Sequence, residues 1–202
     1  MKDPQIRKQE ILDASLRLFA KQGFIQTTIN DILDAVGIAK GAFYHYFASK
    51  DEVLEQIIEH IVEYTSITAR RLAANKKMPV VDRIFAILSS QKLRGDQQQI
   101  ILTLHQSGNE LFHLLSQQAV IASLTPILGE VVAEGVASGE LATDYPRQAV
   151  AMILTSAMML TDVDSPLADE DQEQTLLALL VGAERLLGAK PGSFISRIEN
   201  FR

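Results

Sequence analysis

The chain has 202 residues, of which 47% are hydrophobic and 22% are charged, a balance ordinary for a soluble globular protein. It contains no cysteine, which excludes disulfide bonds and thiol chemistry. The net charge of −6 is uneven, because residues 1–50 carry +2 and the remainder carries −8, which suits a small basic head on an acidic body. No apolar run approaches the roughly 20 residues that cross a bilayer, so we expect a cytoplasmic protein without a membrane partner.

The whole chain is predicted to be helical. Nearly every segment repeats its apolar residues with a helical period, and no stretch alternates as a strand does. Asp3 followed by Pro4 forms a cap and first-turn pair, so the first helix is expected to begin there and to end near Gly23. We therefore predict an all-α fold.

Residues 27–50 carry the most informative pattern of the chain. Thr28 is predicted to cap a second helix together with Asp31, and Gly37 to end that helix in the left-handed conformation. A short helix over residues 40–47 follows, crowded with aromatic and basic residues. Two short helices around a glycine turn are typical of a helix-turn-helix segment, whose second helix enters the major groove of DNA.

Longer helices are predicted for the rest of the chain. Ser49 with Glu52 forms a second capping box, and the helix that it starts extends to about residue 75. At 1.5 Å per residue this helix is roughly 39 Å long and can reach from the head into the body. The later helices are predicted at residues 80–91, 97–105, 109–138 with a bend near Pro126, 146–161 and 170–187.

The chain resembles the TetR, or tetracycline-repressor-like, family of transcriptional regulators from Arg7 to about Leu54. The resemblance lies in RKQEILDASLRLFAKQGF and TTINDILDAVGIAKGAFYHYFASKDEVL, which include a Gly-x-Phe-Tyr-x-x-Phe-x-x-Lys pattern at residues 41–50. It implies a helix-turn-helix DNA-binding head at residues 1–49, joined by the long helix to a ligand-binding and dimerisation body at residues 50–202. It also implies about nine helices in all, dimerisation through the last two, and release of DNA when a small molecule enters the body.

Ten residues are predicted to contact double-stranded DNA. They are Thr27, Thr28, Tyr44 and Lys50 for positioning on phosphates, Ala39, Lys40, Gly41, Ala42 and His45 at the groove, and Tyr46 for phosphate or sugar. The resemblance implies that the hydroxyls of Thr28 and Tyr44 and the ammonium of Lys50 grip phosphates. Lys40 could reach guanine O6 or N7, and Ala42 could touch a thymine methyl. Thr28 caps its helix whether or not DNA is present, and the two roles are compatible.

The body is expected to enclose an apolar effector cavity with a few polar groups at its wall. Its predicted lining is Phe85, Leu88, His105, Asn109, Phe112, His113, Met152 and Met159. His105, Asn109 and His113 recur at every fourth position, so an unbroken helix would carry them along one side. The same pattern also fits satisfied core or surface polar groups, and methionine-rich helices are often plain core.

The last two predicted helices are apolar over more than one face. This excess is expected if each buries one side in its own subunit and another against a second copy, which predicts a homodimer. Two-fold symmetry would place the two recognition helices roughly 34 Å or somewhat more apart on a pseudo-palindromic operator. Burial wholly inside a monomer is the alternative.

The sequence therefore predicts a ligand-responsive DNA-binding regulator, a repressor that a small apolar or amphipathic effector releases from its operator. One alternative is a DNA-binding regulator whose acidic body binds a protein partner. A second is an all-α enzyme that uses His105, Glu110 and His113. No nucleophile motif, phosphate loop or metal-binding pattern accompanies these three residues, so we expect no catalysis, no cofactor and no metal.

Overall fold

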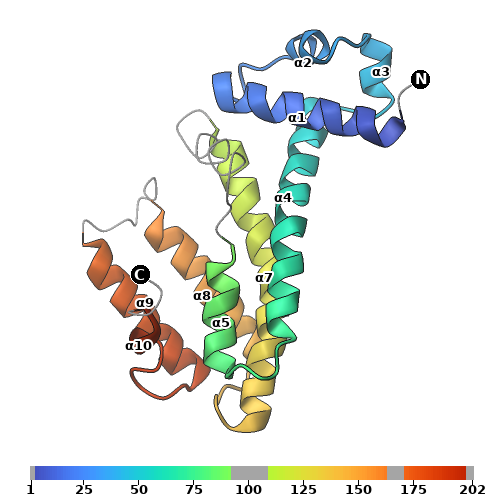
Figure 1. Cartoon of the computed structure of the whole chain (residues 1–202). Coiled ribbons are helices and arrows are strands. Elements are labelled where there is room, and N and C mark those ends of the chain that lie inside the picture. Colours follow the sequence, from blue (N-terminus) through green and yellow to red (C-terminus); the bar gives the residue numbers. More distant parts are fainter. Residues whose placement is uncertain (1–2, 92–108, 163–170, 199–202) are drawn as a thin grey trace. The chain divides into compact units, whose positions relative to one another are not determined.

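The computed structural model describes residues 3–91, 109–162 and 171–198, and within these ranges the chain forms nine helices and no strand (Figure 1). The predicted all-α class is therefore confirmed. The helices are α1 (Pro4–Gln22), α2 (Ile29–Val36), α3 (Lys40–Tyr44), α4 (Lys50–Ala73), α5 (Val80–Ser89), α7 (Glu110–Ser138), α8 (Pro146–Thr161), α9 (Gln172–Leu187) and α10 (Ile195–Ile198). The helix predicted at residues 97–105 lies outside the described residues.

The predicted helix ends of the head, α1 to α3, are confirmed where local side chains fix them. The Asp3 carboxylate accepts the Gln5 N–H at 2.8 Å and so caps α1. The Thr28 hydroxyl accepts the Asp31 N–H at 3.2 Å, while the Asp31 carboxylate accepts the Thr28 N–H at 2.7 Å. Gly37 ends α2 with φ 70° and ψ 45°, a left-handed conformation that glycine adopts without strain.

Three details differ from the prediction. Helix α3 stops at Tyr44 instead of residue 47, because the chain tightens there and the Tyr46 N–H bonds back only three residues, to the Phe43 carbonyl. At the start of α4 the Ser49 hydroxyl accepts the Glu52 N–H, as expected, but the Glu52 carboxylate accepts the N–H of Ala48 instead of that of Ser49. The single turn α10 has too few residues to show a helical period in the sequence.

The chain divides into two compact units, and the functional division predicted at residue 50 stays a prediction. The described part of the first unit runs up to Tyr64 and from Asn109 to Ala119, so it holds the head together with the beginnings of α4 and α7. The second unit holds the ends of α4 and α7 together with α5, α8, α9 and α10. Both long helices therefore contribute to both units.

Each unit has its own apolar core. In the first, Phe19, Phe43, Phe47 and Phe112 are fully buried, and the rings of Phe43 and Phe47 lie 5.8 Å apart. This aromatic cluster docks the short helices of the head. In the second unit, aliphatic side chains of α5, α7, α8 and α9 surround an edge-on pair of rings, Phe85 and Phe194, at 5.3 Å. Burial of such rings dominates the packing energy of small helical cores.

Helix α7 is long and apolar enough to cross a membrane by length and composition alone. In its most apolar stretch, 44% of the residues are buried inside the fold. Leu124, Leu128 and Val131 are among its core side chains. The apolar character of α7 is therefore that of a core helix in a globular protein.

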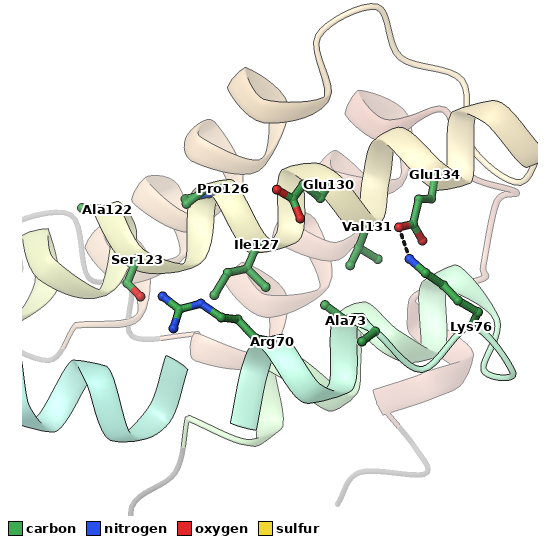
Figure 2. A pocket seen from close by; sticks show the side chains of 11 residues that line it. Arg70, Ala73, Lys76, Ala122, Ser123, Pro126, Ile127, Glu130, Val131 and Glu134 are labelled. Atoms are coloured by element: carbon green, nitrogen blue, oxygen red, sulfur yellow. Dashed lines mark hydrogen bonds and ion pairs between the residues drawn. The ribbon is translucent and has the colours of Figure 1, made fainter. Parts of the chain in front are cut away.

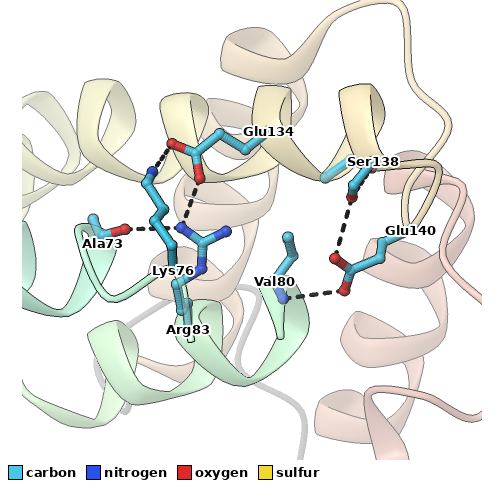
Figure 3. Close-up of polar contacts among 8 residues, drawn as sticks. Ala73, Lys76, Val80, Arg83, Glu134, Ser138 and Glu140 are labelled. Carbon is cyan, nitrogen blue, oxygen red and sulfur yellow. Dashed lines mark hydrogen bonds and ion pairs between the residues drawn. The ribbon is translucent and has the colours of Figure 1, made fainter. Parts of the chain in front are cut away.

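A charged cluster fastens the end of α4 and the start of α5 to α7 (Figure 3). The Arg83 guanidinium, which is 4% exposed, donates to the Ala73 carbonyl at 2.8 Å and to the Glu134 carboxylate at 2.6 Å. Lys76 also pairs with Glu134. The hydrogen bond from Lys76, followed by that from Arg83, holds the pKa of Glu134 below its ordinary value.

We predict that Glu134→Gln lowers the free energy of unfolding by about 1 kcal/mol at pH 7, because partial exposure screens the pairs. A depressed pKa in the folded state stabilises the protein above the unfolded pKa of about 4.3, and this contribution is lost as the pH falls through the folded pKa. Urea unfolding should therefore show the difference from wild type shrinking towards pH 3. Glu130→Gln, one turn earlier on α7, is the control, and a difference that stays constant with pH would contradict the assignment.

Candidate nucleic-acid interface

Helix α3 is held on the head by one fully buried side chain and leaves the rest of its surface free. Phe43 is fully buried, and its ring meets the neighbouring Tyr44 ring edge-on at 5.5 Å. The turn after Gly37 is short, and α3 begins at Lys40 without a side-chain cap. A helix-turn-helix needs a buried anchor and a free outer face. Phe43 provides the anchor, and its neighbours on α3 are exposed. Figure 1 shows α2 and α3 joined by the short turn.

Most of the predicted DNA contacts are exposed on or next to α2 and α3. Those exposed in the structure are Thr28, Ala39, Lys40, Gly41, Ala42, Tyr44 and His45, and Tyr46 is half-buried. The Lys40 ammonium lies 5.9 Å from the centre of the Tyr44 ring, a distance at which a cation is attracted to the ring face. No atom lies within 4 Å of the position that a Cβ on Gly41 would occupy, so the backbone of α3 is open to close approach here.

Two predicted phosphate contacts, Thr27 and Lys50, have a different role in the structure. Thr27 is 1% exposed, and its hydroxyl donates to the Gly23 carbonyl at 2.8 Å. The Lys50 ammonium donates to the carbonyls of Phe24 at 2.6 Å, Thr27 at 2.7 Å and Ile25 at 3.4 Å. These bonds occupy the three N–H donors of a lysine, so Lys50 closes the turn between α1 and α2 instead of presenting a free cation.

Burial lowers the pKa of Lys50, whose ammonium also lies 4.3 Å from the centre of the Phe24 ring. By contrast, the pKa of Asp31 is lowered chiefly by the backbone hydrogen bond from Thr28 and then by that residue's hydroxyl. The start of α2 thus keeps a carboxylate next to the exposed Thr28 hydroxyl. A carboxylate in the first turn of a helix is favoured by the helix dipole, so this one is explained by capping.

The predicted effector residues that the structure describes are divided between the two units. Asn109, Phe112 and His113 belong to the first unit, where Phe112 joins the core of the head. The others that the structure describes belong to the second unit, with Phe85 in its core and Leu88, Met152 and Met159 exposed. His105 lies outside the described residues.

A groove of about 610 Å³ runs between the end of α4 and the middle of α7, within the second unit (Figure 2). Its charged lining residues are Arg70, Lys76, Glu130 and Glu134, two of each sign, and none of the predicted effector residues lines it. Small and aliphatic side chains also line the groove, with Ala73 on α4 and Ser123 and Ile127 on α7. The groove is therefore charge-balanced, and the apolar effector cavity stays a prediction. No group of three metal-binding side chains occurs in the described ranges.

Comparison with known proteins agrees with this geometry. Residues 11–57, which include the helix-turn-helix, match the family described as bacterial regulatory proteins, tetR family. Residues 11–57 therefore form a DNA-binding head of the tetR family. It is 26% identical over 193 residues to the fatty acid metabolism regulator protein of Bacillus subtilis (strain 168), an alignment that covers 89% of the chain and 92% of that relative.

Two further similar proteins match different lengths of the chain. The HTH-type transcriptional repressor KstR2 of Mycobacterium tuberculosis (strain ATCC 25618 / H37Rv) is 31% identical over 74 residues, which cover only 37% of each protein. A solved TetR/AcrR-family regulator from Thermobifida fusca superposes with a TM-score of 0.60 at 26% identity, over 92% of this chain and 99% of that one. These relatives are transcriptional regulators, not enzymes, and the protein is a DNA-binding transcriptional regulator. Regulators of the tetR family bind DNA and small-molecule effectors and act as dimers.

The contacts of Lys50 predict that Lys50→Met destabilises the head. The variant keeps the length of the side chain but leaves the carbonyls of Phe24 and Thr27 without a donor, which should cost about 1 to 3 kcal/mol. In thermal unfolding this corresponds to a fall in the midpoint of roughly 2 to 12 °C.

Lys40→Met on the outer face of α3 is the matched control and should unfold like the wild type. If Lys50→Met unfolds like the wild type and only reduces the salt dependence of DNA binding, by about one unit of slope, Lys50 is a phosphate contact after all.

Proposed function

We propose that this TetR-family regulator is a cytoplasmic homodimeric repressor, which a small apolar or amphipathic effector releases from a pseudo-palindromic operator. The observation that carries the proposal is the outer face of α3, exposed from Ala39 to Ala42 while Phe43 anchors the helix beneath. An exposed short helix with small residues at its start fits closely into a major groove. Among the described residues of the head, these side chains do not belong to the apolar core.

The exposed residues fall into two groups by their chemistry. Thr28 and Tyr44 offer hydroxyls at the edge of the surface and suit phosphate contacts, which position the head without selecting a sequence. Lys40, Ala42 and His45 suit the groove itself, with Lys40 directed at guanine and Ala42 at a thymine methyl. Tyr46, whose ring packs edge-on against His45 at 5.0 Å, supports the second group.

The proposed dimer surface consists of the outer faces of α8 and α9, which pack against each other in the second unit. Its exposed apolar residues are Met152, Met159, Leu177 and Leu186, with Met152 59% exposed. Ala178 and Gly182 on α9 are also exposed, and such small residues let two helices approach closely. A second copy on this surface would bury the apolar excess and pair the two heads.

For the effector, we propose a fatty acid or one of its thioesters. The support is the fatty acid metabolism regulator of Bacillus subtilis, because its alignment extends through the second unit as well as the head. An acyl chain also has the apolar and amphipathic character expected from the sequence. Control by a protein partner is the alternative. It becomes the favoured one if no ligand affects the protein.

Selection of bound sequences from a random duplex pool should yield a two-fold symmetric site with half-sites about one DNA turn apart. Lys40→Ala should relax the preference at one base pair of each half-site, at a cost of about 1 to 3 kcal/mol for the selected sequence. Tyr44→Phe should weaken binding to selected and random duplexes by similar factors, because it loses a phosphate contact. A selected site without two-fold symmetry would contradict the dimeric operator complex.

Long-chain fatty acids and their thioesters should lower the affinity for the selected duplex by about 5 to 150-fold. Fluorescence anisotropy of labelled duplex measures the loss, and thermal unfolding should show that the ligand stabilises the protein without DNA. Short-chain fatty acids at the same concentrations are the control. If the panel neither stabilises the protein nor releases DNA, the acyl proposal is wrong.

A further inference from the structure

Phe24 lies in the turn between α1 and α2, and residues from three other parts of the first unit contact it. Its N–H donates to Asn109 Oδ1 at 2.9 Å, and its carbonyl accepts from the Lys50 ammonium at 2.6 Å. Its ring meets the Phe19 ring edge-on at 5.1 Å. Phe19 lies on α1, Lys50 begins α4, and Asn109 directly precedes α7. The whole arrangement lies within the first compact unit.

The Asn109 side chain acts as a cap for the end of α1. Gly23 turns the chain out of the helix with φ 85° and ψ 153°, so the next N–H, that of Phe24, loses a helical acceptor. Phe24 and Asn109 are each only 5% exposed, so water cannot replace that acceptor. Asn109 Nδ2 also lies 3.5 Å from the Phe19 carbonyl, in the last turn of α1. One side-chain amide thereby serves a donor and an acceptor of the head.

The backbone of Asn109 belongs to α7. The His113 N–H donates to the Asn109 carbonyl at 3.0 Å, which is the first helical bond of α7. A displacement of this first turn therefore carries the Asn109 amide with it. The turn that receives the amide leads within four residues to Thr28, the cap of α2, and Lys50 holds the Thr27 carbonyl along the way.

We infer that Asn109 is a positioning residue for DNA binding, through which the first turn of α7 sets the start of α2. The inference rests on the proposed function only in requiring that the head binds DNA. The Asn109 contact links α7 to the head. This link is separate from the direct connection of the head to α4 at Lys50. Any event that shifts the first turn of α7 would then change DNA affinity by straining the bond to Phe24.

Hydrogen exchange of the free protein gives the first test, which needs no DNA. The Phe24 amide should exchange slowly in the wild type and at least about tenfold faster in Asn109→Leu, which keeps the volume but removes the acceptor. Gln118→Ala, which removes an exposed amide from the same helix, is the control and should leave the exchange unchanged. Unchanged exchange of Phe24 in Asn109→Leu would overturn the contact itself.

Binding of the selected duplex gives the second test. Asn109→Leu should bind at least about fivefold more weakly than the wild type and Gln118→Ala, at a temperature where circular dichroism shows all three folded. In the wild type, the duplex should also slow exchange at residues 110–113, and in Asn109→Leu it should not. A purely structural role would not produce this DNA-dependent difference in α7.

The outcomes separate the inference from the proposed function. If the wild type binds duplex without slowing exchange at residues 110–113, the inference is overturned while the regulator remains a DNA-binding protein. This wild-type result also decides the matter if Asn109→Leu fails to fold. If the wild type binds no duplex at all, the proposed function fails, and slow exchange of Phe24 still establishes the cap.

Discussion

The placement of the helix-turn-helix depends on the ammonium of Lys50, which bonds to three carbonyls of the turn between α1 and α2. These carbonyls point to one side because the chain leaves α1 at Gly23 and must reach the cap of α2 within a few residues. A single cation with three donors satisfies them together, and no neutral side chain of similar size could. The fixed turn then determines where α2 starts, and Phe43 sets α3 against it.

The parts of this head that could be predicted from the sequence are those fixed by neighbours in the chain. The bonds between Thr28 and Asp31 join residues three apart, and the left-handed turn at Gly37 depends on one residue. Burial of Phe43 follows from its helical spacing, and with the anchor known, the outward positions of Lys40 and Tyr44 follow as well. Local patterns therefore defined most of the candidate DNA surface.

The contacts that could not be predicted join residues distant in the sequence. Asn109 was expected in an effector cavity, but its side chain accepts a hydrogen bond from the N–H of Phe24, 85 residues earlier. No periodic pattern in the sequence predicts that contact. Lys50 did carry a signal: it is the first residue of α4, where the helix dipole disfavours a positive charge. A cation in that position needs acceptors elsewhere, here 23 to 26 residues before it. The predicted effector lining is divided between the two units for a related reason, because an apolar side chain does not reveal which of two cores it joins.

The small charge of the head makes these long-range contacts important for function. With a net charge of only +2 over residues 1–50, the head as a whole attracts the DNA polyanion weakly, so binding that is independent of sequence contributes modestly to affinity. The surface at the groove consists largely of small side chains, which gain energy only when the helix approaches closely. Affinity then depends steeply on the position of α3, and so on the turn that Lys50 and Asn109 hold. A regulator built in this way needs only a small displacement of either support to leave its DNA.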